Sequence, residues 1–201
     1  MTSKTIAQGA EAIITREKDK VTKNRIKKSY RIPFLDEKLR KSRTRSEAKI
    51  IKKLEKIIPV PKILKTDEKQ EIIMDFIAGK KLSENLEFLD YKKVCKQIAE
   101  NISKMHNSGI VHGDLTTSNM IYVEKDKKVY FIDFGLAFHS EKIEDKAVDL
   151  HLLQQALEAK HFRVWQECYK IIMDNYKPEK YKDIMQRIKV IESRGRYKDK
   201  Y

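Results

Sequence analysis

Two short motifs near the middle of the chain restrict its possible folds more than any other feature. Residues 112–119 read HGDLTTSN, which has the form H-x-D-x-x-x-x-N, and they lie between a helical pattern and a short apolar strand. Fourteen residues after Asn119 comes Asp133, which begins a D-F-G tripeptide at the end of a second apolar strand. This order and spacing are typical of the catalytic loop and the metal-binding segment of phosphotransferases.

Phosphoryl transfer requires these residue types. Asp114 supplies a carboxylate that can orient the proton of an attacking hydroxyl or water, and the oxygens of Asn119 and Asp133 are hard ligands for Mg²⁺. Each motif alone is weak, because an Asp and an Asn in one loop usually cap helices or form turns. Their combination in this order favours the catalytic interpretation.

A kinase-type site also needs a lysine on an early strand and a glutamate on the following helix. Lys23 lies in a predicted strand over residues 21–25, and Glu47, 24 residues later, lies within a predicted helix. We expect Lys23 to hold the phosphates of ATP and Glu47 to fix Lys23. The alternatives are a solvated Lys23 and a Glu47 that pairs with Arg43, one helical turn before it.

Two further segments are candidates for nucleotide contacts. Gly9 and Ala10, followed by Glu11, separate two predicted strands, and small residues there let backbone N–H groups approach phosphates. The segment has one glycine rather than the three of a G-x-G-x-x-G loop, and alone it would be an ordinary hairpin turn. Asp75 and Ile77, at the end of another predicted strand, lie where an adenine edge would meet the backbone of a hinge.

The element patterns predict an α+β fold with two lobes. Short strands surround one long helix, predicted over residues 35–58, in the first part of the chain, and helices dominate the second part. We therefore expect a minimal bilobal, protein-kinase-like fold. Its parts are an N-lobe over 1–77, a mainly helical C-lobe over 78–193 and a basic tail over 194–201.

The net charge of +14 is concentrated in two places. Residues 16–56 hold 17 Lys/Arg against 6 Asp/Glu, and residues 194–201 hold four against one. Such segments attract phosphate backbones or acidic partners, although lysine-rich helices are also common solvated surfaces. The two cysteines, Cys95 and Cys168, encode neither a disulfide framework nor a zinc site, and no apolar run reaches the length of a bilayer span, so we expect a cytoplasmic protein without a membrane segment.

With these motifs in place, the chain resembles the atypical protein kinase and ATPase family of the KEOPS complex, the PRPK family, which is related to the RIO kinases. The segments that carry the resemblance span nearly the whole chain: GAEA at 9–12, KNR at 23–25, KSYR at 28–31, RT at 43–44 with EA at 47–48, HGDLTTSNM at 112–120, DFGL at 133–136, EDKAVDL at 144–150 and RGR at 194–196. The unbroken HGDLTTSNM run is the most discriminating of them.

The resemblance implies a function in tRNA modification. Members of this family act with a threonylcarbamoyl transferase partner to make N6-threonylcarbamoyladenosine (t6A) in tRNA, with further small KEOPS subunits bound to the N-lobe. By the same resemblance, Lys23 and Asp114 would be catalytic, Glu47 would orient Lys23, Asn119 and Asp133 would bind Mg²⁺, and ATP hydrolysis would be the productive activity. The basic tail is our candidate for contacts with tRNA.

Departures from ordinary protein kinases agree with that expectation. Gly113 stands where an H-R-D motif has arginine, so the usual cationic pocket for an activation-loop phosphate is missing. Only eight residues separate Gly135 from Glu144, which leaves little chain for a peptide-binding platform. Two alternatives are an independent RIO-like protein serine kinase and a nucleotide-binding assembly module whose catalysis is dispensable; the presence of all five site residues argues against the second.

Overall fold

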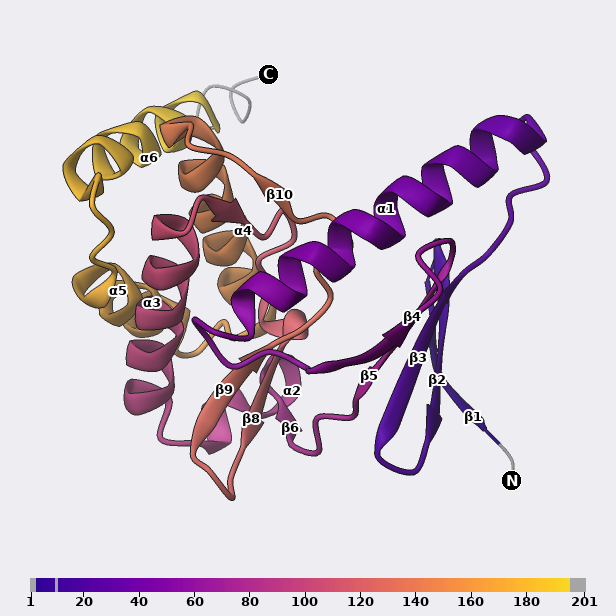
Figure 1. Ribbon diagram of the computed structural model, residues 1–201. Coiled ribbons are helices and arrows are strands. Elements are labelled where there is room, and N and C mark those ends of the chain that lie inside the picture. The colour runs from indigo at the N-terminus through magenta and orange to yellow at the C-terminus, as the bar shows by residue number, and fades with distance from the viewer. Residues whose placement is uncertain (1–2, 10, 196–201) are drawn as a thin grey trace. The chain divides into compact units, whose positions relative to one another are not determined.

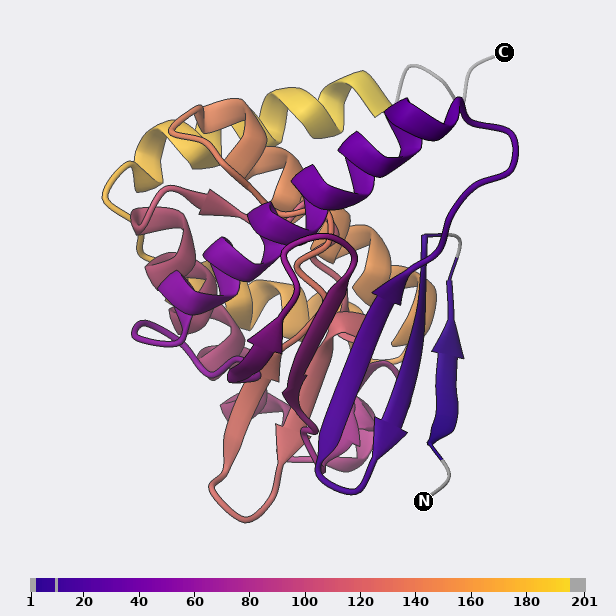
Figure 2. The ribbon, with the colours of Figure 1, turned by 45° about the vertical axis from the view of Figure 1, so that its right-hand side comes forward.

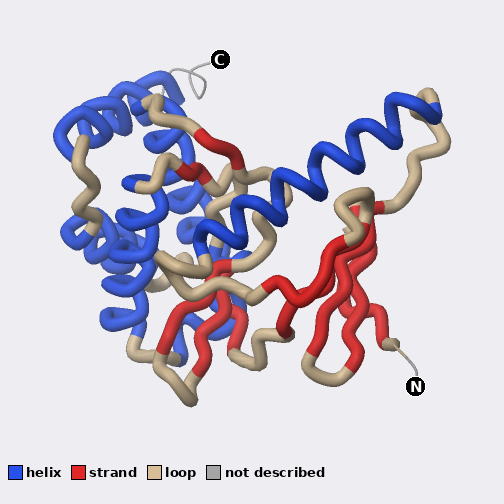
Figure 3. The backbone as a smooth tube through the Cα atoms, in the orientation of Figure 1, coloured by secondary structure: helices blue, strands red, loops and turns tan. Residues whose placement is uncertain are grey.

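The computed structural model describes residues 3–9 and 11–195, with no side-chain description for the last two of these. It divides into two compact units, which we call the sheet unit (residues 1–56 and 60–78) and the helical unit (residues 57–59 and 79–201). Strands dominate the first unit and helices the second, as the colours of Figure 3 show. The α+β fold class predicted from the sequence is therefore confirmed.

The sheet unit is built on five antiparallel strands in the spatial order β1-β2-β3-β5-β4. Their bounds are β1 Lys4–Gln8, β2 Ala12–Glu17, β3 Lys20–Arg25, β4 Ile63–Thr66 and β5 Glu71–Asp75. β1 pairs with β2 and β2 with β3, each antiparallel, so these three strands form a meander (Figure 2). The central strand β3 therefore has a hydrogen-bonded neighbour on each side, which fixes the register of its side chains.

One helix, α1 (Pro33–Leu54), accompanies this sheet (Figure 1). Pro33 occupies its first turn, where the missing N–H costs no hydrogen bond. Ala48 on its buried side packs against Ile72 and Met74 of β5. The helix ends four residues before the predicted end at residue 58, because the residue preceding Pro59 is disfavoured in helical conformation and the chain turns before it.

The helical unit contains four long helices whose apolar faces pack together. They are α3 Tyr91–Asn107, α4 Ile143–Lys160, α5 Trp165–Asn175 and α6 Tyr181–Gly195. Val94, Ile98, Ile102 and Met105 form an apolar stripe on α3, and all four are buried. The side chain of Asp90 accepts a hydrogen bond from the N–H of Lys93 and caps the start of α3, and Gly109, with φ of +70°, follows its end.

Shorter elements connect these helices and position the loops of the unit. They are β6 Lys80–Lys81, α2 Leu82–Asn85, the 3-10 helix η1 Leu86–Phe88, β7 Ile110–Val111, the 3-10 helix η2 Thr117–Asn119, β8 Met120–Val123, β9 Lys128–Phe131 and β10 Phe138–His139. Strands β6, β8 and β9 form one antiparallel sheet, and β7 pairs with β10. Within the described residues, no helix is both long and apolar enough to span a membrane.

Candidate active site

A buried ion pair joins the strand and the helix of the sheet unit. Lys23 on β3 places Nζ 2.7 Å from Oε1 of Glu47 on α1. Only 7% of the Lys23 surface and 2% of the Glu47 surface are exposed. The structure thus brings together the two residues that the sequence paired, while their role in binding phosphate stays a prediction.

Arg25 provides a second cation for the same carboxylate. Its Nη2 lies 2.5 Å from Oε2 of Glu47, so each oxygen of Glu47 receives one charged donor. Arg25 is buried and follows Lys23 by two positions, which places both side chains on one face of β3. Arg25 has no role among the sequence predictions, although the alternation of side chains along the strand places it on the same face as Lys23.

The segment predicted to cover the nucleotide connects β1 to β2. The N–H of Gly9 donates to the carbonyl of Ala12 at 3.0 Å. A β-carbon added to Gly9 would have the Ala12 carbonyl oxygen, at 3.9 Å, as its nearest neighbour, so internal packing does not demand a glycine here. Glu11 bonds to Arg31 and Arg43 through its carboxylate, and the predicted contact residue Ala10 lies outside the described residues.

The predicted hinge residues, Asp75 and Ile77, lie at the end of β5 and just after it. Asp75 is the last residue of β5, and its N–H donates to the carbonyl of Lys62 at 3.0 Å. The next N–H, of Phe76, donates to the carbonyl of Asp19 at 2.8 Å. Ile77 is half-buried. The backbone around Asp75 is therefore held by neighbouring segments of the sheet unit.

In the helical unit, the two polar residues of the catalytic-loop motif contact each other directly. Nδ2 of Asn119 donates to the main-chain oxygen of Asp114 at 2.9 Å and to Oδ2 of its carboxylate at 2.8 Å. Because both partners are acceptors, the amide nitrogen must face Asp114. The amide oxygen Oδ1 is then the atom of Asn119 that can bind a metal ion.

The hairpin of β8 and β9 carries Asn119 and Asp133 to one end of the same sheet. Met120 pairs with Phe131 in the ladder, and the N–H of Ile132 donates to the carbonyl of Asn119 at 2.9 Å. Asn119 therefore lies beside the residue that immediately precedes Asp133. One end of this hairpin thus gathers three of the predicted site residues, Asp114, Asn119 and Asp133.

Asp133 has a backbone conformation that few residue types tolerate. Its φ is +58°, in the left-handed region that Asp and Asn populate more readily than other side chains. Its side chain is exposed, and Oδ1 accepts the N–H of Gly135 at 3.3 Å. An exposed carboxylate near an amide oxygen suits Mg²⁺, which binds to one or two protein oxygens together with phosphates and water. Within the described residues, no group of three or more His, Cys, Asp or Glu could hold a metal.

A buried aspartate fixes the beginning of the catalytic loop. Asp149 on α4 accepts the N–H groups of His112 and Gly113, each at 2.9 Å. It also lies 3.2 Å from Nε2 of His106, whose Nδ1 is 2.7 Å from the hydroxyl of Tyr176. Asp149 thus holds the backbone at the start of the catalytic loop, and the sequence gives no local signal for the two ring residues behind it.

His112 and Gly113 connect this brace to the D-F-G segment. The His112 ring lies 4.9 Å from the ring of Phe134, centroid to centroid, and burial lowers the pKa of its imidazole. Gly113 has φ of +76°, and a β-carbon there would overlap the carbonyl of Leu136. Only glycine satisfies both conditions, which gives a physical reason for the absence of arginine at this position.

The middle of the catalytic loop is held by a histidine from another part of the unit. Nε2 of His161, which follows α4, lies 3.0 Å from the hydroxyl of Thr117, and both residues are buried. Burial lowers the pKa of His161. The sequence does not reveal this contact, because 44 residues separate the two partners and no spacing rule relates them.

Comparison with known proteins identifies the family of this chain. A RIO-domain model matches residues 9–153. The chain is 44% identical over 189 residues to the KEOPS complex subunit Bud32 of Pyrococcus abyssi, covering 90% of this chain and 85% of that protein. The chain belongs to the RIO-domain family. Within it the chain belongs with the Bud32 proteins, and its two units form a minimal kinase-like α+β fold.

Other Bud32-type relatives differ in length. The subunit BUD32 of the EKC/KEOPS complex from Encephalitozoon cuniculi is 37% identical over 194 residues, and the match covers 96% of this chain and 95% of that protein. A probable bifunctional tRNA threonylcarbamoyladenosine biosynthesis protein of Methanothermobacter thermautotrophicus is 40% identical over 200 residues. The match covers 96% of this chain but only 36% of that protein, so the chain spans about a third of the bifunctional relative.

The RIO-domain match includes every site residue predicted from the sequence. It begins at Gly9 and extends past Asp149, whereas His161 lies beyond its end. The kinase-like family implies nucleotide binding with a metal ion, which agrees with the chemistry of Lys23, Asn119 and Asp133. The residues predicted to bind phosphate and metal therefore all lie within the part of the chain that matches the RIO domain.

Proposed function

We propose that this chain is the Mg-ATP-dependent, kinase-like ATPase subunit of a KEOPS complex, and that it supports t6A formation in tRNA by a threonylcarbamoyl transferase partner. Relatives named as KEOPS Bud32 subunits and as tRNA threonylcarbamoyladenosine biosynthesis proteins support this function. The part of the bifunctional relative that this chain does not span is where we expect the transferase activity.

The observation that carries the catalytic part of the proposal is the double hydrogen bond from Asn119 to Asp114, beside the strand that leads to Asp133. This arrangement holds the Asp114 carboxylate beside Asn119, whose amide oxygen is one of the two proposed metal ligands. Asp114 orients the attacking water, or a serine hydroxyl in autophosphorylation, and receives its proton.

The remaining roles follow from charge and burial. Lys23, held by Glu47, binds the phosphates as a cation whose position is fixed before the nucleotide arrives. Mg²⁺, when bound, neutralises charge that develops on the phosphate oxygens. Oδ1 of Asn119 and the carboxylate of Asp133 would hold that ion.

The segment after the D-F-G tripeptide favours ATP hydrolysis over phosphorylation of other proteins. Residues 136–142 connect Gly135 to α4, and they contain β10, which pairs with β7. The N–H of Ser140 also donates to the carbonyl of Gly109 at 2.9 Å. A short segment held at several points offers little backbone to an extended peptide, so water is the acceptor we favour.

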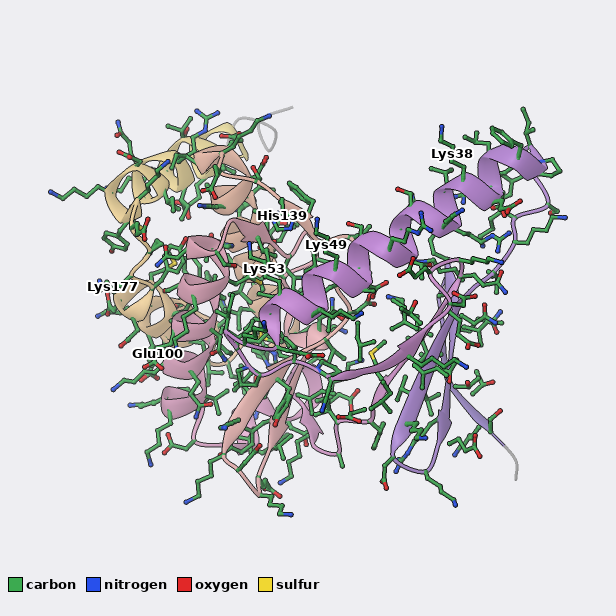
Figure 4. The ribbon with its side chains drawn as sticks, viewed as in Figure 1. Lys38, Lys49, Lys53, Glu100, His139 and Lys177 are labelled. Atoms are coloured by element: carbon green, nitrogen blue, oxygen red, sulfur yellow. The ribbon has the colours of Figure 1, made fainter. Side chains whose placement is uncertain are left out.

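Basic residues supply the candidate surfaces for tRNA and partner subunits. Lys38, Lys49 and Lys53 all lie on α1, towards both of its ends, and are exposed (Figure 4). The basic segment over residues 194–201, proposed to contact tRNA, falls mostly outside the described residues. Both segments would bind phosphates with an affinity that falls as salt rises.

ATP hydrolysis measured under three conditions tests this proposal. The conditions are the chain alone, the chain with the transferase partner, and the chain with the partner and tRNA, each with and without Mg²⁺. We expect hydrolysis to depend on Mg²⁺ and to rise when the partner and tRNA are added. A parallel assay follows phosphate transfer to unrelated proteins.

Three results would count against the proposal. Strong phosphorylation of unrelated proteins by the chain alone would favour an independent serine kinase. Full t6A formation by a complex whose kinase-like subunit carries Asp114→Asn would favour a non-catalytic assembly role. A rate of ATP hydrolysis that does not change when the partner and tRNA are added would argue against a role in tRNA modification.

A further inference from the structure

We infer that Glu11 is a positioning residue, which fastens the β1–β2 loop to α1 rather than contacting the nucleotide. We call the contacts of Glu11 with Arg31 and Arg43 the loop latch. The inference rests on the proposed nucleotide-binding function and gives Glu11 a different role from the direct contact expected from the sequence.

The latch uses both oxygens of one carboxylate. Nη2 of Arg31 lies 2.9 Å from Oε1 of Glu11, and Nη1 of Arg43 lies 2.8 Å from Oε2. The main-chain carbonyl of Glu11 also accepts the N–H of Ile26 at 3.2 Å. The residue after the small-residue turn is therefore tied to the end of β3, to the β3–α1 connection and to α1.

The arginines of the latch are themselves anchored. Arg31 lies 3.7 Å from Asp36, a fully buried carboxylate in the first turn of α1. Asp36 also accepts hydrogen bonds from Arg40 at 2.8 Å and from the N–H of Lys28 at 3.3 Å. Because Asp36 fixes the β3–α1 connection, Arg31 reaches Glu11 from a backbone that is already held in place.

Arg43 relates the latch to the phosphate-binding lysine. It lies four residues before Glu47 on α1, so the two side chains project from one face of the helix. The sequence left open a pair between Arg43 and Glu47; in the structure Arg43 bonds to Glu11, while Glu47 bonds to Lys23 and Arg25. One helix thus fixes both the β1–β2 loop and Lys23.

Electrostatics explains why a carboxylate is tolerated in this loop. A bare carboxylate beside nucleotide phosphates would repel them. The hydrogen bond from Arg31, with a further contribution from Arg43, lowers the pKa of Glu11, so the group is ionised and neutralised by two guanidinium groups at neutral pH. The latch also restrains Glu11 itself, which reduces the entropy that this residue would lose when the nucleotide binds.

A purely stabilising ion pair would behave differently from a latch. Partly exposed pairs contribute little to stability, so their removal alone predicts a small change in unfolding and no change in nucleotide affinity. A latch predicts a looser β1–β2 loop and a higher KM for ATP at nearly constant kcat, because the loop binds phosphates in both the ground state and the transition state.

The test compares Glu11→Gln and Arg43→Gln with Arg45→Gln. Arg45 is the matched control, because it lies on the same helix and forms an exposed pair with Glu68 at 3.4 Å. Two properties are measured: hydrogen exchange of the β1–β2 loop without nucleotide, and KM and kcat for ATP. We expect both latch variants to exchange faster and to raise KM about fivefold to tenfold. Arg45→Gln should match the wild type.

The reversed pair, Glu11→Arg with Arg43→Glu, should recover part of the affinity lost by either single change. The inference would be overturned if Glu11→Gln left both the hydrogen exchange of the β1–β2 loop and the KM for ATP unchanged. A lower melting temperature with no change in either property would overturn it as well. If the wild type binds no ATP, the proposed function fails, and hydrogen exchange without nucleotide still decides whether the latch exists.

Discussion

Asn119 donates its side-chain amide to two oxygens of Asp114, the main-chain carbonyl and the carboxylate. This contact closes the loop that carries both residues and leaves one carboxylate oxygen and one amide oxygen to act on other groups. The nitrogen of Asn119 thus has a positioning role, and its oxygen has the chemistry of a metal ligand.

The variant Asn119→Asp should slow ATP hydrolysis roughly a hundredfold and move the pH of maximal turnover upward. Two carboxylates would then face each other, and like charges at this distance resist ionising together. A pH–rate profile measures both effects. Asn85→Asp on α2 is the control, and a profile of Asn119→Asp that overlays the wild type would refute the positioning role.

Glu47→Gln should lower the free energy of unfolding by about 3–5 kcal/mol, because it leaves two buried cations without their shared carboxylate. Urea unfolding measures the loss. The exposed Glu37 on the same helix offers a matched Glu→Gln control, for which we expect a change below about 0.5 kcal/mol. Equal stabilities of the two variants would show that the buried ion pairs do not hold α1 to β3.

Thr117→Val should destabilise the chain by about 1–3 kcal/mol and reduce kcat, since it keeps the shape of the side chain but leaves Nε2 of His161 buried without its partner. Thr117→Ser retains the hydroxyl and should restore both properties. Urea unfolding and ATP turnover are the measurements. A valine variant with full turnover would mean that His161 contributes only to folding.

The stability of the chain should decrease as the pH falls from about 7 to about 5. Burial lowers the pKa of His112 and of His161, so the unfolded chain, with imidazoles that titrate near 6.5, takes up protons before the folded chain does. Each histidine contributes a slope of up to about 1.4 kcal/mol per pH unit within this window.

Urea unfolding at pH 7.5, 6.5 and 5.5 measures this slope, and His161→Asn should make it shallower. The lowered pKa of Asp36, caused mainly by its hydrogen bond from Arg40, acts at more acidic pH: its stabilisation is present above the unfolded value near 4 and is lost below it. A stability that stays constant or rises between pH 7.5 and 5.5 would contradict the burial of two neutral histidines.

The sequence predicted the α+β fold and the pairing of Lys23 with Glu47, because these signals are local or follow known spacing. The HGDLTTSN loop and the strand before Asp133 can each be recognised from a short stretch of sequence. The two-residue strands β7 and β10 were missed, because they are too short to show a period.

The supporting contacts could not be derived in the same way. His161 reaches Thr117 and the latch arginines reach Glu11 across long separations in sequence, and only the folded backbone brings these groups together. The requirement for glycine at position 113 also depends on a distant segment, because the Leu136 carbonyl occupies the space that a side chain would fill.

The most direct test of the proposed function is Mg²⁺-dependent ATP hydrolysis by the wild type and by Asp133→Asn. Asparagine tolerates the positive φ at this position and can accept the N–H of Gly135, so this change removes the charge without the backbone strain that alanine would add. We predict a fall in turnover of roughly a hundredfold or more with an unchanged melting temperature. Turnover by a folded Asp133→Asn variant at the wild-type rate would contradict the account.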